Sequence, residues 1–108
     1  MTASTLDRAA HAVADPTRRA ILRLVTPGEQ SVADIASNFD VTRPAISQHL
    51  RVLREAELVT IREVGTRRLY KARPEGLGEL RGWVEGFWTD ALDRLAMAAE
   101  AERREAGE

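Results

Sequence analysis

The feature that most constrains the fold is a pair of short amphipathic segments separated by three residues. The first, over residues 31–39, places Val32, Ile35 and Phe39 on one side of a helix. The second, over residues 42–56, begins with a threonine suited to cap a helix. Two helices joined by so short a connection predict a helix-turn-helix.

The second of these helices has two different faces. At 100° per residue, Ile46, Leu50 and Leu53 form one narrow apolar stripe, so we expect them in the core. Its first two turns contain no acidic residue, and the polar residues exposed there are expected to be Thr42, Arg43, Ser47, Gln48, His49 and Arg51.

Such a face suits DNA, because arginine can bond guanine and glutamine can bond adenine in the major groove. The small Ser47 and Pro44 would let the helix approach the bases closely. In helix-turn-helix docking, the N-terminal part of the second helix reaches the base edges. The alternative is an ordinary solvated polar face.

After this helix the apolar period changes toward two, which predicts a β-hairpin of residues 59–64 with 67–72. Gly65 can supply the positive φ of the turn. The basic residues of the hairpin are Arg62, Arg67, Arg68, Lys71 and Arg73. They suit phosphate contacts, although edge strands also carry basic residues to discourage aggregation.

The charge is divided along the chain. The net charge is −1, yet residues 41–73 hold eight basic against three acidic residues, and residues 75–108 hold four against nine. A local basic region of this kind favours a nucleic-acid partner. The absence of cysteine excludes disulfides and thiolate metal sites, and no secretory signal or membrane span is expected, so the cytoplasm is the expected location.

The remaining segments complete a single domain over residues 1–108. A first helix is expected over residues 6–15, and a second begins at Pro16 with Asp15 as its cap. A long helix is expected over residues 75–105. The predicted fold is mainly α with a small β-hairpin wing, in the order α-α-α-α-β-β-α, which is a winged helix-turn-helix.

The long helix carries Trp83, Phe87 and Trp88 on neighbouring turns, more apolar surface than a small monomer can cover. Packing against a second copy is the first interpretation. A pocket for an apolar small-molecule effector between the last helices is the alternative.

The chain resembles the ArsR family of bacterial winged-helix repressors over about residues 8–95. The resemblance rests on "VADPTRRAIL" at 13–22, "RPAISQHLRVLREAELV" at 43–59 and "GTRRLYKARPEGLGEL" at 65–80. It implies a homodimer, formed by the first and last helices, that reads palindromic operator DNA. The helix of residues 42–56 would lie in the major groove and the wing on the backbone or minor groove.

The resemblance assigns two sets of residues. Those expected to bind DNA are Thr42, Arg43, Pro44, Ser47, Gln48, His49, Arg51, Arg62, Arg67 and Arg68. Those expected at the dimer interface are Leu6, Ala10, Val13, Leu80, Trp83, Val84, Phe87, Trp88, Leu92 and Leu95. Arg18 and Arg19 are left outside both sets, because a surface role beside Asp15 explains them as well as contact with the DNA backbone.

The departures from the family concern metals and one turn. Ser31, Ala33 and Ala36 stand about where metal-sensing relatives have cysteines, and the last helix has no histidine, so no metal or other cofactor is expected. His11 is expected to be structural. Glu57 stands where relatives usually have a glycine that ends the reading helix in a left-handed turn.

No catalytic constellation is present, since the chain has no phosphate-binding glycine loop and no cysteine nucleophile. The predicted function is that of a dimeric DNA-binding repressor that regulates other genes or its own promoter. The alternative is a protein-interaction module that keeps the fold but has lost DNA binding.

Overall fold

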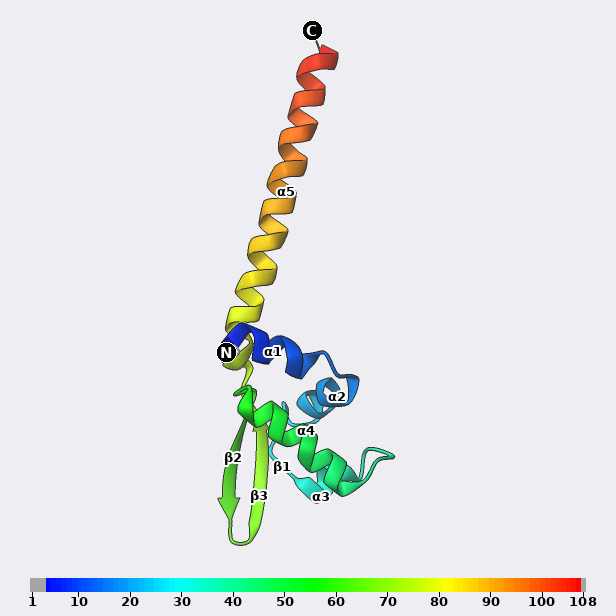
Figure 1. Ribbon diagram of the computed structural model, residues 1–108, viewed down its shortest axis with the longest axis vertical. Coiled ribbons are helices and arrows are strands. Elements are labelled where there is room, and N and C mark those ends of the chain that lie inside the picture. Colours follow the sequence, from blue (N-terminus) through cyan, green and yellow to red (C-terminus); the bar gives the residue numbers. More distant parts are fainter. Residues whose placement is uncertain (1–3, 108) are drawn as a thin grey trace.

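The computed structural model describes residues 4–107 and confirms the winged helix-turn-helix (Figure 1). Its helices and strands, in chain order, are α1 (Thr5–Val13), α2 (Pro16–Leu24), β1 (Gln30–Ser31), α3 (Val32–Ala36), α4 (Arg43–Glu55), β2 (Val59–Val64), β3 (Arg67–Ala72), the 3-10 helix η1 (Pro74–Leu77) and α5 (Gly78–Gly107).

Side-chain caps start each of the first four α-helices. In each case a hydroxyl or carboxylate oxygen accepts a hydrogen bond from the backbone N–H three residues later, which satisfies a donor that the helix leaves free. The caps are Ser4, Asp15, Ser31 and Thr42. Two of these, Asp15 and Thr42, were expected from the sequence, and they fix where α2 and α4 begin.

The core lies where α2, α3 and α4 meet the sheet. Ile46, Leu50 and Leu53 of α4 are buried, as predicted. Their partners are Ile21, Val25, Ile35, Leu58, Val59 and Tyr70. Burial of each large aliphatic side chain contributes roughly 1.5–3 kcal/mol, so this apolar stripe holds α4 with its opposite face toward solvent.

The sheet has one strand more than predicted. The hairpin of β2 and β3 has the expected residues, Val59 opposite Ala72 and Val64 opposite Arg67, and Gly65 in its turn has φ 62°. In addition, β1 pairs antiparallel with β3 and gives the order β1-β3-β2. Two residues are too few to show a strand pattern in the sequence.

Two short helices differ from the prediction. Helix α3 ends at Ala36, so Phe39 packs on the core from the turn that follows rather than from the helix. Helix α1 is Thr5–Val13 rather than residues 6–15, and its buried residues are Ala9 and Ala12, while the expected interface residues Leu6, Ala10 and Val13 are half-buried. Half-buried side chains remain available for contact with a second copy, so the place of these residues at a dimer interface stays a prediction.

Helix α4 ends in a left-handed turn at Glu57, which has φ 59°. The Leu58 N–H donates to Leu53 O and the Glu57 N–H donates to Arg54 O, both at 2.9 Å. This pair of bonds is the Schellman arrangement, in which glycine is the usual left-handed residue. Glu57 thus adopts the left-handed conformation for which relatives usually have a glycine.

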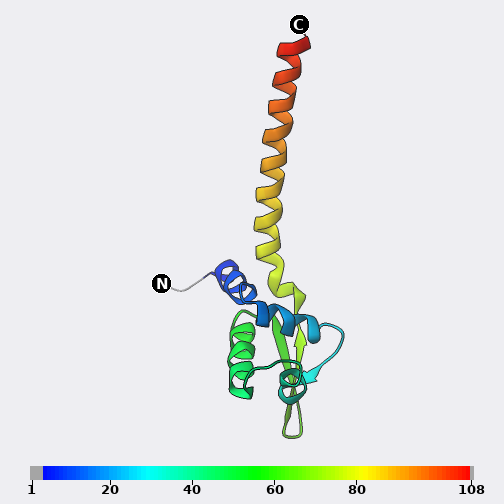
Figure 2. The same cartoon turned by 90° about the vertical axis from the view of Figure 1, so that its right-hand side faces the viewer.

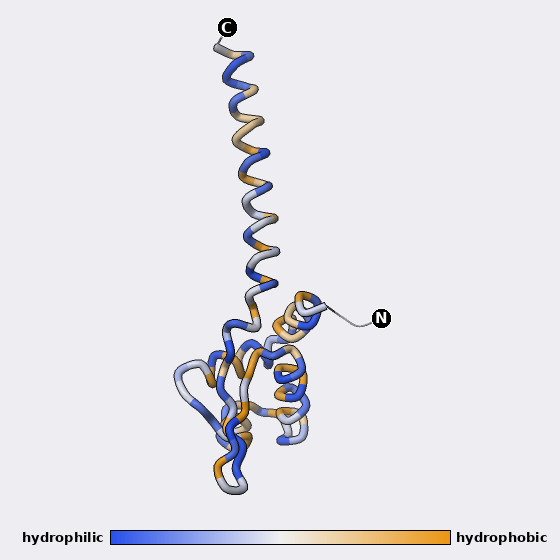
Figure 3. The backbone as a smooth tube through the Cα atoms, turned by 90° about the vertical axis from the view of Figure 1, so that its left-hand side faces the viewer, coloured by the Kyte–Doolittle hydropathy of each residue, from blue (hydrophilic) through white to orange (hydrophobic). Residues whose placement is uncertain are grey.

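The last helix starts later than predicted and projects from the rest of the molecule (Figures 1 and 2). Residues 74–77 form η1, and α5 begins at Gly78 rather than at residue 75. The molecule is 75 Å long because α5 extends away from the wing. Apolar and polar positions alternate along this helix (Figure 3). Within residues 4–107, no helix has the length and apolar character needed to cross a membrane.

Candidate nucleic-acid interface

The outward face of α4 is free of packing contacts over its first two turns. Arg43, Pro44, Ser47, Gln48 and Arg51 are all exposed. The first acidic side chain along the helix is Glu55, which pairs with Arg51 at 3.2 Å, and both side chains of that pair are well exposed. The structure thus leaves available the donors and acceptors that base reading would need.

Thr42 is also exposed, but its hydroxyl oxygen accepts the Ala45 N–H at 3.2 Å. Thr42 is therefore the N-cap of α4. Arg43, the first residue of α4, is exposed directly after this cap.

His49 lies differently from the other residues expected to bind DNA. Its side chain is only 24% exposed, and its Nδ1 atom lies 3.2 Å from the Arg18 guanidinium and 3.9 Å from the Asp15 carboxylate. That ring atom therefore points toward α2. The angular position of His49 at the edge of the apolar stripe was the signal that could have indicated this.

Each expected arginine of the wing lies near a carboxylate of the same chain. The pairs are Arg62 with Glu29 at 2.9 Å, Arg67 with Asp34 at 3.6 Å and Arg68 with Glu63 at 3.7 Å. The arginine side chains of these pairs are 57–64% exposed. Exposed ion pairs contribute about 0–1 kcal/mol, so a phosphate can replace the carboxylate at small cost.

Two hollows join the wing to the reading helix. One, of about 280 Å³, is lined by Ser31, Val32, Ala33, Arg43, Thr66, Arg67 and Arg68. The other, of about 380 Å³, is lined by Val32, Ser47, Leu50, Arg51, Arg54, Arg68 and Tyr70. Helix α4 and the wing thus form one surface, and Figure 2 shows them side by side.

Arg54 and Thr66 on this surface were not among the expected site residues. Arg54 is three residues after Arg51, so helical spacing places the two on adjacent turns of one side. Thr66 follows Gly65 at the wing tip, where sequence spacing alone does not show which element the tip approaches.

The residues expected at a dimer interface leave a large apolar surface uncovered. Trp83, Phe87 and Trp88 are 56%, 62% and 63% exposed, and the rings of Trp83 and Phe87 stack with centroids 5.6 Å apart. Val84, Leu92 and Leu95 are also exposed along α5, while Leu80 is half-buried. Exposed apolar side chains gathered along one helix are typical of a protein–protein interface.

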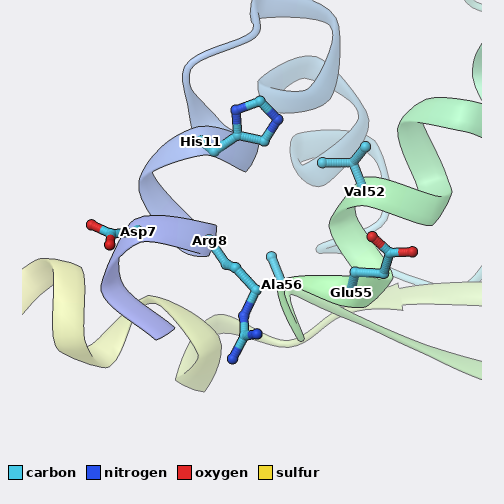
Figure 4. A pocket seen from close by; sticks show the side chains of 6 residues that line it. All are labelled: Asp7, Arg8, His11, Val52, Glu55 and Ala56. Carbon is cyan, nitrogen blue, oxygen red and sulfur yellow. The ribbon is translucent and has the colours of Figure 1, made fainter. Parts of the chain in front are cut away.

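A further pocket of about 270 Å³ lies between α1 and α4 (Figure 4). Arg8 and His11 of α1 face Val52 and Glu55 of α4 across it. The two histidines therefore occupy separate places, His11 at this pocket and His49 beside α2. In the part of the chain that the structure describes, no three histidine, aspartate or glutamate side chains gather as a metal site would require.

Comparison with known proteins identifies relatives of the chain. The family described as "Bacterial regulatory protein, arsR family" matches residues 15–60. The HTH-type transcriptional regulator Rv2034 of Mycobacterium tuberculosis is 47% identical, over 89% of this chain and 90% of the relative. The transcriptional repressor SdpR of Bacillus subtilis is 36% identical, over 70% of this chain and 84% of the relative.

A solved structure agrees with these relatives. The solution structure of a homodimeric winged helix-turn-helix DNA-binding domain from Mycobacterium bovis has a TM-score of 0.63 and 29% identity, covering 83% of each chain. The relatives are named as regulators rather than as enzymes. With 47% identity to a regulator over nearly its whole length, the chain belongs to the ArsR family of bacterial regulatory proteins.

Proposed function

We propose that this protein is a homodimeric repressor that binds palindromic operator DNA in the bacterial cytoplasm. The observation that carries the proposal is the acid-free, exposed start of α4 beside a wing of exposed arginines. The names of its relatives, a transcriptional repressor and a homodimeric DNA-binding domain, support the same conclusion.

In this proposal the roles divide by chemistry. Arg43, Ser47 and Gln48 read base edges, because they occupy the exposed first two turns of α4 and carry the groups that pair with guanine and adenine. Arg51, Arg62, Arg67 and Arg68 contact phosphates, and each exchanges a nearby carboxylate for a phosphate. Pro44 packs against the sugar-phosphate edge, and the Thr42 backbone lies at the same edge.

The dimer supplies the symmetry of the operator. Helix α5 projects from the domain away from the wing tip, and α1 lies beside the start of α5 (Figure 1). The exposed aromatic side chains belong to α5, and the half-buried Leu6, Ala10 and Val13 belong to α1. Pairing two copies through these surfaces leaves both α4 helices free, and a twofold dimer then matches a twofold DNA site.

The experiment that tests the proposal is a salt titration of duplex binding. A duplex is selected by the full-length protein from a random-sequence pool, and its affinity is measured by fluorescence anisotropy between roughly 50 and 200 mM salt. Binding through several phosphates predicts that the affinity falls by about 10³-fold or more over this range. If no duplex is enriched, or if the affinity is independent of salt, the chain acts as a protein-interaction module instead.

A further inference from the structure

A buried arginine outside the DNA-facing surface connects three helices. Arg18 of α2 is 9% exposed. Its Nε atom donates to Ala12 O at 2.7 Å and its Nη2 atom donates to His11 O at 3.0 Å, both at the end of α1. Its Nη1 atom lies 3.2 Å from Nδ1 of His49 in α4. One guanidinium therefore binds both a helix of the proposed dimer interface and the reading helix.

The surroundings of Arg18 explain why a charge is tolerated there. The carbonyls at the C-terminal end of α1 carry partial negative charge from the helix dipole. The Asp15 carboxylate is nearby, and its pKa is lowered chiefly by the hydrogen bond from the Arg18 backbone N–H and also by the charge of Arg18. A buried charge is stable only with partners of this kind.

The contact with His49 is directional. For Arg18 to donate, Nδ1 of His49 must be without hydrogen, so the ring hydrogen is on Nε2. The imidazole is thereby held in one orientation. Along α4, His49 stands between the exposed Gln48 and the buried Leu50. A bond at this position constrains the rotation of α4 about its own axis and its angle to α1.

We propose that Arg18 is a positioning residue that sets the spacing between the two recognition helices of the dimer. This inference rests on the proposed function. Two copies joined through α1 and α5 place their α4 helices at a distance that depends on the angle between α1 and α4. Operator half-sites must match this distance, about 34–36 Å for one helical turn of DNA. The Arg18 link therefore selects the length of the spacer between half-sites.

The neighbouring arginine provides a matched control. Arg19 donates from Nη1 to Val13 O at 2.8 Å and to Ala14 O at 3.0 Å, so it too binds the end of α1. Unlike Arg18, it is exposed, and its hydrogen bonds within residues 4–107 do not reach α4. Arg19→Met removes the same kind of contact and leaves the link between α1 and α4 intact.

The test measures affinity for a series of duplexes in which the selected half-sites are separated by increasing spacer lengths. Wild type and Arg19→Met are expected to prefer one spacer by about tenfold over its neighbours, a difference of about 1.4 kcal/mol. Arg18→Met and His49→Leu are expected to reduce this preference to about threefold or less. His49→Asn keeps an acceptor near the position of Nδ1 and is expected to retain the wild-type preference.

A purely structural role for Arg18 gives a different pattern. If Arg18→Met and His49→Leu weaken binding equally at every spacer length, the inference is wrong. His49→Leu keeps the contacts of Arg18 with α1. Its affinities across the spacer series therefore test the link to α4 even if Arg18→Met does not fold. If wild type binds none of the duplexes, the proposed function fails first, and this inference with it.

Discussion

Asp34 of α3 lies beside Arg67 of the wing, with its Oδ2 atom 3.6 Å from Nη2 of the arginine. Both side chains are more than 60% exposed. The pair joins the first helix of the helix-turn-helix to the wing tip. It also places a negative charge at the surface that we propose for phosphate contact, where a carboxylate opposes binding.

Replacing Asp34 with asparagine is therefore expected to strengthen DNA binding. The change frees Arg67 and removes a repulsive charge, so we expect affinity to rise by about three- to tenfold at low salt, with a smaller gain as salt screens the charges. Asp90→Asn on α5 makes the same charge change far from the wing. An equal gain from Asp90→Asn would show that only net charge matters.

Glu57 is the position at which a stabilising substitution is expected. Its φ of 59° disfavours any residue with a Cβ, and its side chain is exposed. Glu57→Gly is expected to raise the free energy of unfolding by about 1 kcal/mol, as measured by urea denaturation. Glu55→Gly, at the last residue of α4, is expected to lower it by up to about 1 kcal/mol. A loss of stability in Glu57→Gly would contradict this account of the turn.

Gly76 is the position at which alanine is expected to be harmful. A Cβ atom there would overlap the carbonyl oxygen of Glu57 and lie 2.8 Å from Cδ2 of Leu58. Gly76→Ala is expected to lower the free energy of unfolding by about 1–3 kcal/mol, because η1 must move away from the turn. Gly78→Ala, where nothing lies within 4 Å, is the control and is expected to be neutral or stabilising. Equal changes in the free energy of unfolding for Gly76→Ala and Gly78→Ala would mean that η1 can move away from Glu57 without cost.

Asp15 is expected to make stability depend on pH in the acid range. Its pKa is lowered from 3.8, chiefly by the hydrogen bond from the Arg18 backbone N–H. A lowered pKa in the folded state stabilises the protein above the unfolded-state pKa, and this stabilisation is lost as the pH falls through the folded-state value. Asp15→Asn keeps a capping side chain but has no charge to titrate.

Wild type is therefore expected to be more stable than Asp15→Asn at about pH 7, and the difference should shrink below pH 3.8. Asp15→Ala is expected to lose about 1 kcal/mol at neutral pH, because the cap itself is removed. Urea denaturation at several pH values measures all three. If the difference in the free energy of unfolding between wild type and Asp15→Asn does not change with pH, the charge of the Asp15 carboxylate is not its cause.

The parts of the fold that follow from neighbouring residues were predictable. The caps at Asp15 and Thr42 act on residues three positions away, and the turn at Gly65 fixes the pairing of β2 with β3. The apolar stripe of α4 was equally clear, because Ile46, Leu50 and Leu53 repeat at helical spacing. Family resemblance then pointed to Glu57 as an unusual turn residue.

The parts that depend on distant contacts were not predictable. Arg18 and His49 are 31 positions apart, and only the crossing of α2 with α4 brings their side chains together. The need for glycine at residue 76 arises from a turn almost twenty residues earlier. The acidic partners of the wing arginines, Asp34 and Glu29, come from α3 and the preceding loop, and no local pattern links them to the wing.

The central claim is that the exposed start of α4 reads DNA sequence, and Gln48→Ala tests it most directly. The measurement is the ratio of affinities for the selected duplex and for random DNA, with Arg67→Ala as the comparison. We expect Gln48→Ala to lower this ratio by roughly fivefold or more, and Arg67→Ala to weaken both affinities about equally and leave the ratio unchanged. An unchanged ratio for Gln48→Ala, with both affinities reduced alike, would contradict the claim.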